Sequence, residues 1–147
     1  MSLRLVTDQP GQPPVVWQWL HARTRLPWSS DLRTIGVMRP DGTVAAAVGF
    51  NGWQDQSCWM HVAFDTAHSL TRELLRSAFH YPFMHCGKAA VYALIDQGNA
   101  ECLRLVRRLG YREVVKTVDC VMFEMRHDEC RWIKEQEHGQ RISACSA

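Results

Sequence analysis

The sequence predicts a single α/β domain of the three-layer α+β kind, in which a mixed, mostly antiparallel sheet is flanked by helices. Three observations support this fold class. Apolar segments separated by turns over residues 34–64 predict an antiparallel meander. Residues 89–125 contain a buried strand, a capped helix and two closing strands. A helix over 69–79 joins these two parts, which predicts a right-handed βαβ crossover.

Length and composition exclude several classes of protein. The 147 residues are enough for one domain with its own core, and a net charge of +2 is too mild to indicate a nucleic-acid-binding protein. No apolar run approaches the length of a membrane span, and the N-terminus lacks the apolar core of a signal peptide. We therefore expect a cytoplasmic protein with no membrane partner.

The six cysteines favour reduced structural thiols. No pair has C-x-x-C spacing, and no His/Cys spacing matches a structural zinc pattern. Reduced thiols also fit a cytoplasmic location. We therefore predict neither disulfides nor a metal site.

The first half of the chain is expected to be mainly strands. The apolar runs predict strands at 3–6, 34–38, 43–50 and 57–64, and a helix at 15–23. Residues 26–31 form an irregular connection. Pro40, Asp41 and Gly42 lie between the second and third strands, and this residue combination predicts a hairpin turn.

The second half is expected to hold two helices and three strands. Leu70, Leu74 and Ala78 form one stripe of the helix at 69–79, and Pro82 marks its approximate end. The predicted strands are 89–95, 114–118 and 121–125. The domain should extend over residues 1–133, followed by a polar, disordered tail at 134–147.

The helix at 99–109 has the clearest signals. Asn99 is a good N-cap, and Gly110 is the expected stop because it can take positive φ. The apolar stripe comprises Cys102, Leu105, Val106 and Leu109, and the exposed face comprises Arg104, Arg107 and Arg108.

This helix resembles the fourth-helix motif of the GNAT superfamily of N-acyltransferases. The matching residues are Asn99, Cys102, Leu105, Arg108, Gly110 and Tyr111, and the order of elements over residues 33–126 agrees with the family. Three shorter motifs are similar to small GNAT-type proteins of tailed bacteriophages: Met60-His61-Val62, Tyr81-Pro82-Phe83 and Glu129-Cys130-Arg131-Trp132.

The resemblance implies acetyl-CoA as co-substrate, held between the fourth and fifth strands. Backbone groups of the fourth strand, at Val62 and Phe64, would bind the pantetheine arm, and Asn99 would help to hold it. The pyrophosphate would lie on the turn at 67–72, through His68, Ser69, Leu70, Thr71 and Arg72. This turn lacks the glycines of the family pattern, so the N–H groups at the helix start would act as the anion site.

The resemblance also limits the catalytic candidates. His61 lies on the fourth strand and is our first candidate for the general base, because a neutral histidine suits that role near pH 7. Asp96 and Glu124 are the alternatives. Where the family often has a tyrosine proton donor, this chain has Val106. Trp53 and Trp59 would form an acceptor pocket or stack on a base, unless they are packing residues.

The resulting hypothesis is an acetyl-CoA-dependent N-acetyltransferase, encoded by a phage or prophage and located in the host cytoplasm. Its acceptor would be an amine on a small molecule or a protein. The missing glycines and tyrosine leave open a non-catalytic virion, assembly or host-interaction protein, and a nucleobase modifier is a third option. The sequence does not determine the oligomeric state, and a homodimer is one of the options.

Overall fold

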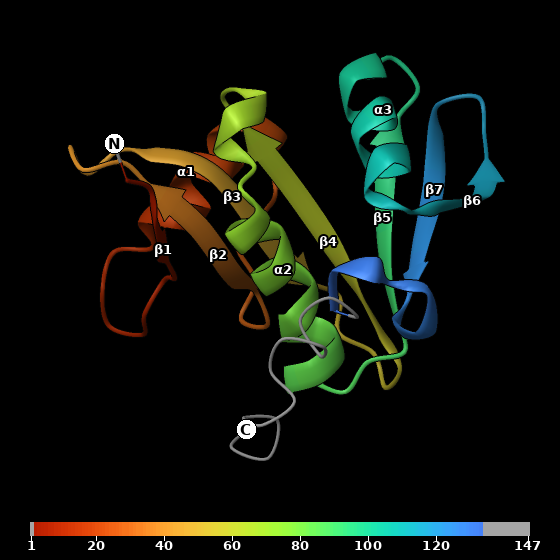
Figure 1. Ribbon diagram of the computed structural model, residues 1–147, viewed down its shortest axis with the longest axis horizontal. Coiled ribbons are helices and arrows are strands. Elements are labelled where there is room, and N and C mark those ends of the chain that lie inside the picture. Colours follow the sequence, from red (N-terminus) through yellow and green to blue (C-terminus); the bar gives the residue numbers. More distant parts are fainter. Residues whose placement is uncertain (1, 134–147) are drawn as a thin grey trace. The chain divides into compact units, whose positions relative to one another are not determined.

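The computed structural model describes residues 2–133. These residues form a seven-stranded, mostly antiparallel sheet in the order β1-β2-β3-β4-β5-β7-β6, flanked by helices, which confirms the predicted fold class (Figure 1). The strands are β1 (Arg4–Val6), β2 (Arg33–Met38), β3 (Val44–Asn51), β4 (Ser57–Phe64), β5 (Ala90–Asp96), β6 (Arg112–Lys116) and β7 (Cys120–Arg126). The α-helices are α1 (Val15–Thr24), α2 (Arg72–His80) and α3 (Ala100–Leu109).

The chain divides into two compact units. Among the described residues, one comprises the chain up to Trp53 with Met60–Ala78, and the other comprises Gln54–Trp59 with the chain from Phe79 onward. Strand β4 and helix α2 each contribute residues to both units. The single domain over residues 1–133 remains a prediction, and the predicted tail at 134–147 lies outside the described residues.

In the first unit, helix α1 packs on β2 and β3. Its core contains Val16, Leu20, Leu26, Leu32, Val44 and Ala47. Pro14 precedes the helix and makes no side-chain cap. Instead, the two carboxylate oxygens of Asp8 accept the N–H groups of Val16 and Trp17, each at 2.9 Å. Asp8 therefore supplies the cap that the residue next to the helix cannot supply.

The hairpin between β2 and β3 forms as predicted. Gly42 has a φ of 89°, which glycine adopts without strain, and Asp41 Oδ1 accepts the Thr43 N–H at 3.0 Å.

Gly49 on β3 has no side chain and leaves space for residues of the core. A Cβ at this position would lie 2.8 Å from Leu20 Cδ2 and 2.9 Å from Leu26 Cδ2. Two leucine side chains thus use the space that a larger residue would fill.

Helix α2 begins later than predicted, at Arg72 instead of residue 69. The carboxylate of Asp65 accepts the Ser69 hydroxyl at 2.6 Å, and this bond accompanies a short 3₁₀ turn at Ala67–Ser69. Thr71 then caps the α-helix, because its Oγ1 accepts the Leu74 N–H at 3.0 Å. The regular helix ends near Pro82 as expected, but a π-helical turn at Tyr81–His85 continues the chain.

In the second unit, α3 matches its prediction closely. Asn99 accepts the Cys102 N–H at 3.1 Å, and Gly110 ends the helix with a φ of 109°. The last carbonyls of α3 accept side-chain donors from later in the chain. Trp132 Nε1 bonds Leu109 O at 3.0 Å, and Arg131 Nη2 bonds Arg108 O at 2.7 Å.

The apolar stripe of α3 is narrower than predicted. Val106 and Leu109 are buried, whereas Cys102 and Leu105 are only partly covered. The interior nearby is aromatic instead. Phe79 contacts Phe83, Tyr111 and Trp132 at ring-centroid distances of 5.9 to 6.4 Å.

The closing hairpin differs in its bounds from the prediction. Strand β6 starts two residues early and ends two residues early, because Thr117 belongs to the turn: its Oγ1 accepts the Cys120 N–H at 3.0 Å. Every residue of β6 is exposed, and its pairing with β7 shifts register between Glu113 and Val115.

Candidate active site

Four side chains form a row across the strands of the second unit. Trp59 on β4 pairs with Tyr92 on β5, Tyr92 pairs with Glu124 on β7, and Glu124 pairs with Arg112 on β6. Directly paired residues project from the same face of a sheet, so these side chains are neighbours. The rings of Trp59 and Tyr92 are 5.5 Å apart. Two residues singled out from the sequence, Trp59 and Glu124, thus belong to one group through Tyr92.

Glu124 is the best-connected member of this row. Its Oε1 accepts Arg126 Nε at 2.9 Å and Arg112 Nη2 at 3.4 Å, and its carboxylate accepts the Tyr92 hydroxyl. Burial raises the pKa of Glu124, but the hydrogen bonds from Arg126, Tyr92 and Arg112 outweigh burial and leave the pKa below its ordinary value. Glu124 is therefore a carboxylate at neutral pH and a weak base.

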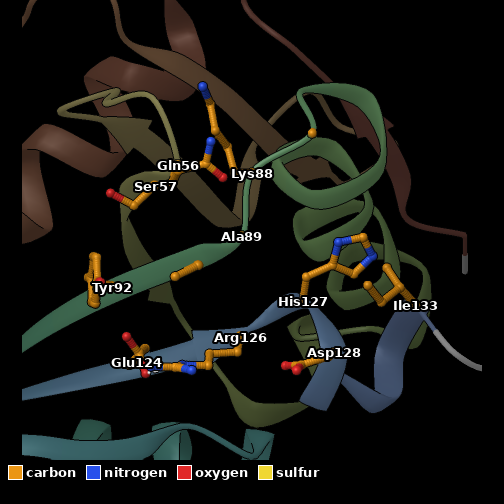
Figure 2. Close-up of a pocket in the computed structure, with 12 residues that line it drawn as sticks. Gln56, Ser57, Lys88, Ala89, Tyr92, Glu124, Arg126, His127, Asp128 and Ile133 are labelled. Carbon is orange, nitrogen blue, oxygen red and sulfur yellow. Dashed lines mark hydrogen bonds and ion pairs between the residues drawn. The ribbon is translucent and has the colours of Figure 1, made fainter.

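Two members of the row, Tyr92 and Glu124, line a pocket of about 690 Å³ within the same unit (Figure 2). The start of β4, the start of β5 and the end of β7 supply its walls. The lining residues are Gln56, Ser57, Gly87, Lys88, Ala89, Ala90, Tyr92, Glu124, Arg126, His127, Asp128 and Ile133. This volume lies within the range of small-molecule sites.

His61, the first candidate base, lies on β4 within the first unit and is half-buried. Its Nε2 lies 2.8 Å from Asn51 Oδ1, so Nε2 carries the proton and Nδ1 holds the lone pair. Burial lowers the pKa of the His61 imidazole below the ordinary value of 6.5. The side chain is therefore neutral near pH 7, as a general base must be.

Asp96 and Asn99 shape the turn before α3. Asp96 Oδ1 accepts the Gly98 N–H at 2.8 Å, and the Asp96 carbonyl accepts the Asn99 N–H at 3.0 Å. The Asn99 side-chain oxygen caps the helix. Both polar side chains have local structural roles, which reduces their availability to a substrate.

The turn at 67–72 offers fewer donors than the sequence suggested. Ser69 is buried and gives its hydroxyl to Asp65, and the N–H groups of Ser69 and Leu70 bond Thr66 and Ala67. The first N–H groups of α2 remain, since those of Arg72 and Glu73 have no acceptor within residues 2–133. Arg72 and His68 are exposed.

The remaining candidates are partly covered. Val62 and Phe64 lie on β4, and both are half-buried. Trp53 lies near Phe50, and its indole N–H donates to Asp31 O at 2.8 Å, which fits a packing role.

Within residues 2–133, no three His, Cys, Asp or Glu side chains gather into a metal-binding group, and no helix is long and apolar enough to cross a membrane. The five described cysteines are thiols, and Cys145 lies beyond them.

Comparison with known proteins identifies the fold. No family model and no curated protein matches the chain. Solved structures do match: spermidine N-acetyltransferase SpeG from Vibrio cholerae has a TM-score of 0.68 at 14% identity, covering 92% of this chain and 98% of SpeG. The chain has the GNAT fold.

A second GNAT structure supports the same conclusion. N-acetyltransferase PseH from Campylobacter jejuni, solved in complex with acetyl coenzyme A, has a TM-score of 0.60 at 12% identity. The match covers 86% of this chain and 99% of PseH. The GNAT fold, predicted from the helix motif and the order of elements over residues 33–126, thus extends over most of the chain.

Of the residues that line the pocket, only Glu124 was a predicted site residue, and the residues that were missed include Tyr92, Arg126 and Asp128. Tyr92 is 32 residues from Glu124, and only the β5–β7 register brings them together. An alternation analysis of β5 and β7 as partners would have paired them, but no local motif marks either residue.

Proposed function

We propose that this protein is an acetyl-CoA-dependent N-acetyltransferase with an amine acceptor. The match of most of the chain to the GNAT fold is the observation that carries the proposal. PseH is named as a complex with acetyl coenzyme A and SpeG as a spermidine acetyltransferase, and we extend the co-substrate and the amine class to this chain.

The first turn of α2 is the proposed pyrophosphate site. The open N–H groups of Arg72 and Glu73 and the positive end of the helix dipole favour an anion there. The exposed Arg72 guanidinium adds a charged donor. Because this turn has no glycine to bring its backbone close to the phosphates, we expect weaker binding than at a glycine-rich turn.

The pantetheine arm would run along the backbone of β4. Val62 and Phe64 lie past the three residues of β4 that pair with β5, Ser57–Trp59. Their backbone groups are the proposed partners of the arm's amides. Asn99 is a weaker candidate for this contact, because its side-chain oxygen already caps α3.

In the proposed reaction, a neutral amine attacks the thioester carbonyl carbon. The new C–N bond forms, the C–S bond breaks, the nitrogen gives its proton to a base and the thiolate takes up a proton to leave as a thiol. His61 is the proposed base, through Nδ1. Val106 stands where the family often has a tyrosine, and it is buried and has no hydroxyl, so another group must protonate the thiolate.

Calorimetry with acetyl-CoA tests the proposal. We expect saturable binding, weakened about three- to tenfold by Arg72→Ala, since one charge-assisted contact contributes roughly 1 kcal/mol or more. Arg104→Ala is the matched control, because Arg104 is also exposed but lies on α3. Absence of binding at millimolar acetyl-CoA would reject the enzyme and favour the non-catalytic phage protein.

A phage or prophage origin, with action in the host cytoplasm, completes the proposal. The resemblance of three short motifs to phage proteins supports it, and the genes beside this one would test it. A nucleobase modifier would instead transfer the acetyl group of acetyl-CoA to an oligonucleotide, which mass spectrometry of the oligonucleotide would detect.

A further inference from the structure

The pocket beside Tyr92 carries charges of both signs. Lys88 and Arg126 supply two cations, and Glu124 and Asp128 supply two carboxylates. Its walls thus carry no excess of negative charge. A polycationic ligand would meet as much repulsion as attraction there.

Most of these charged groups already have partners. Glu124 is bonded to Arg126, Arg112 and Tyr92, and Lys88 Nζ donates to Asp55 O at 3.1 Å. The terminal nitrogens of Arg126 and the carboxylate of Asp128 make no hydrogen bond or close ion pair among residues 2–133, although Glu129 and Asp128 both attract Arg126 electrostatically. One cation and one anion are thus left for a ligand.

These two groups are close in the chain. Arg126 ends β7, and Asp128 lies in the short 3₁₀ turn at His127–Glu129 that follows (Figure 2). The Nε of Arg126 is held on Glu124, which fixes the direction of its guanidinium. The Arg126 guanidinium and the Asp128 carboxylate therefore suit a ligand in which an anionic group and a cationic group are only a few bonds apart.

The rest of the wall suits a short carbon skeleton. Ala89, Ala90 and Ile133 contribute apolar surface, while Ser57 and Gln56 contribute polar groups. Tyr92 borders the pocket at the last rung of the β4–β5 ladder, next to Trp59.

We propose that this pocket is the acceptor site and that it selects a small amine carrying an anionic group close to an ammonium, as an amino acid does. Arg126 holds the anionic group, and Asp128 holds the ammonium. Polyamines, which lack the anionic group, are poor ligands. The role as acceptor site rests on the proposed acetyltransferase function, whereas the ligand class rests on the pocket alone.

Amide chemical shifts in NMR titrations test the ligand class without any CoA. L-Lysine and cadaverine differ only in the carboxylate of lysine, and spermidine represents the polyamines. We expect L-lysine to shift amide signals of residues 88–92 and 124–128 saturably, with at least about tenfold higher affinity than cadaverine or spermidine. Equal or tighter binding of either polyamine, or no binding of L-lysine at millimolar concentration, would overturn the proposal.

Matched variants locate the contacts. Arg126→Gln and Asp128→Asn should each weaken L-lysine binding about tenfold, and Arg104→Gln and Asp119→Asn, two exposed positions outside the pocket, should not. Thermal melting of each variant confirms that it is folded. Unchanged affinity in both pocket variants would contradict the assignment.

The acetyltransferase function and the ligand class of the pocket can each be rejected without rejecting the other. If L-lysine binds but acetyl-CoA does not, the acetyltransferase function fails and the ligand class stands. If acetyl-CoA is turned over with spermidine in preference to amino acids, the function stands and the ligand class fails.

Discussion

Tyr92 and Glu124 lie directly opposite each other on β5 and β7, and the tyrosine hydroxyl donates to the carboxylate. Burial, followed by the bond to Glu124, raises the pKa of Tyr92, while the same bond helps to lower the pKa of Glu124. The pair therefore favours a neutral phenol beside a charged carboxylate over a wide range of pH.

Tyr92→Phe should move the pKa of Glu124 upward, because the carboxylate loses one of its donors. A carbon-detected NMR titration of the glutamate carboxyls measures this pKa directly. Tyr81→Phe is the control, since Tyr81 does not line the pocket. An unchanged titration of Glu124 in Tyr92→Phe would show that the hydroxyl is not a significant donor.

Because His61 is neutral in the folded protein, the free energy of unfolding should depend on pH. In the unfolded chain its imidazole takes up a proton near its ordinary pKa of 6.5, whereas the folded protein does so only at lower pH. The unfolded state thus binds more protons between these values, so stability should fall as pH decreases through about 6.5 and level off below the folded-state pKa.

Urea unfolding of His61→Asn between neutral and mildly acidic pH checks this dependence. The variant should lose part of the slope, while His68→Asn, at an exposed position, should keep it. Asn51→Asp should raise the pKa of His61 by placing a charge beside Nε2. If His61→Asn and the parent protein show the same slope, the imidazole is not held neutral by folding.

Alanine substitutions in helix α3 should reduce the free energy of unfolding in proportion to how deeply each side chain is buried. Leu109→Ala should cost roughly 2–5 kcal/mol, as removal of a buried leucine does. Leu105→Ala should cost less, since Leu105 is only partly buried, and Arg104→Ala should cost least. Equal costs for the two leucines in urea unfolding would mean that the buried face is assigned wrongly.

Gly49→Ala should destabilise the first unit by about 1–3 kcal/mol, because the added methyl group would clash with Leu20 and Leu26. Gly98→Ala is the matched control, since a Cβ there would meet Asp96 Oδ1 at an ordinary 3.4 Å. Calorimetric melting compares the two variants. Similar melting temperatures would show that the leucines adjust without cost.

Local sequence signals predicted most of the fold. Asn99, Gly110 and Gly42 act within a few residues of themselves, so their roles follow from neighbouring sequence alone. The start of α2 could not be predicted this way. Ser69 looked like a helix residue, but its hydroxyl bonds Asp65, and Asp65 is in turn paired with Arg39 from the β2–β3 hairpin.

The candidate site was less accessible to sequence reasoning. His61 and Glu124 were chosen for their chemistry and their place on strands, yet their neighbours come from other strands. Asn51 is ten residues from His61, and Tyr92 is further still from Glu124. Such partners depend on strand register, which a single sequence without strand pairing does not fix.

The exposed strand β6 has a consequence for solubility. Within residues 2–133 it is the last strand of the sheet, and an outer strand offers unpaired backbone groups to other chains. Val114 and Val115 would favour such pairing. The register shift at Glu113 and the charges of Arg112, Glu113 and Lys116 oppose it. On this outer strand, which adds nothing to the core, the charged side chains should therefore oppose fibrous self-association, and neutralising them should favour it.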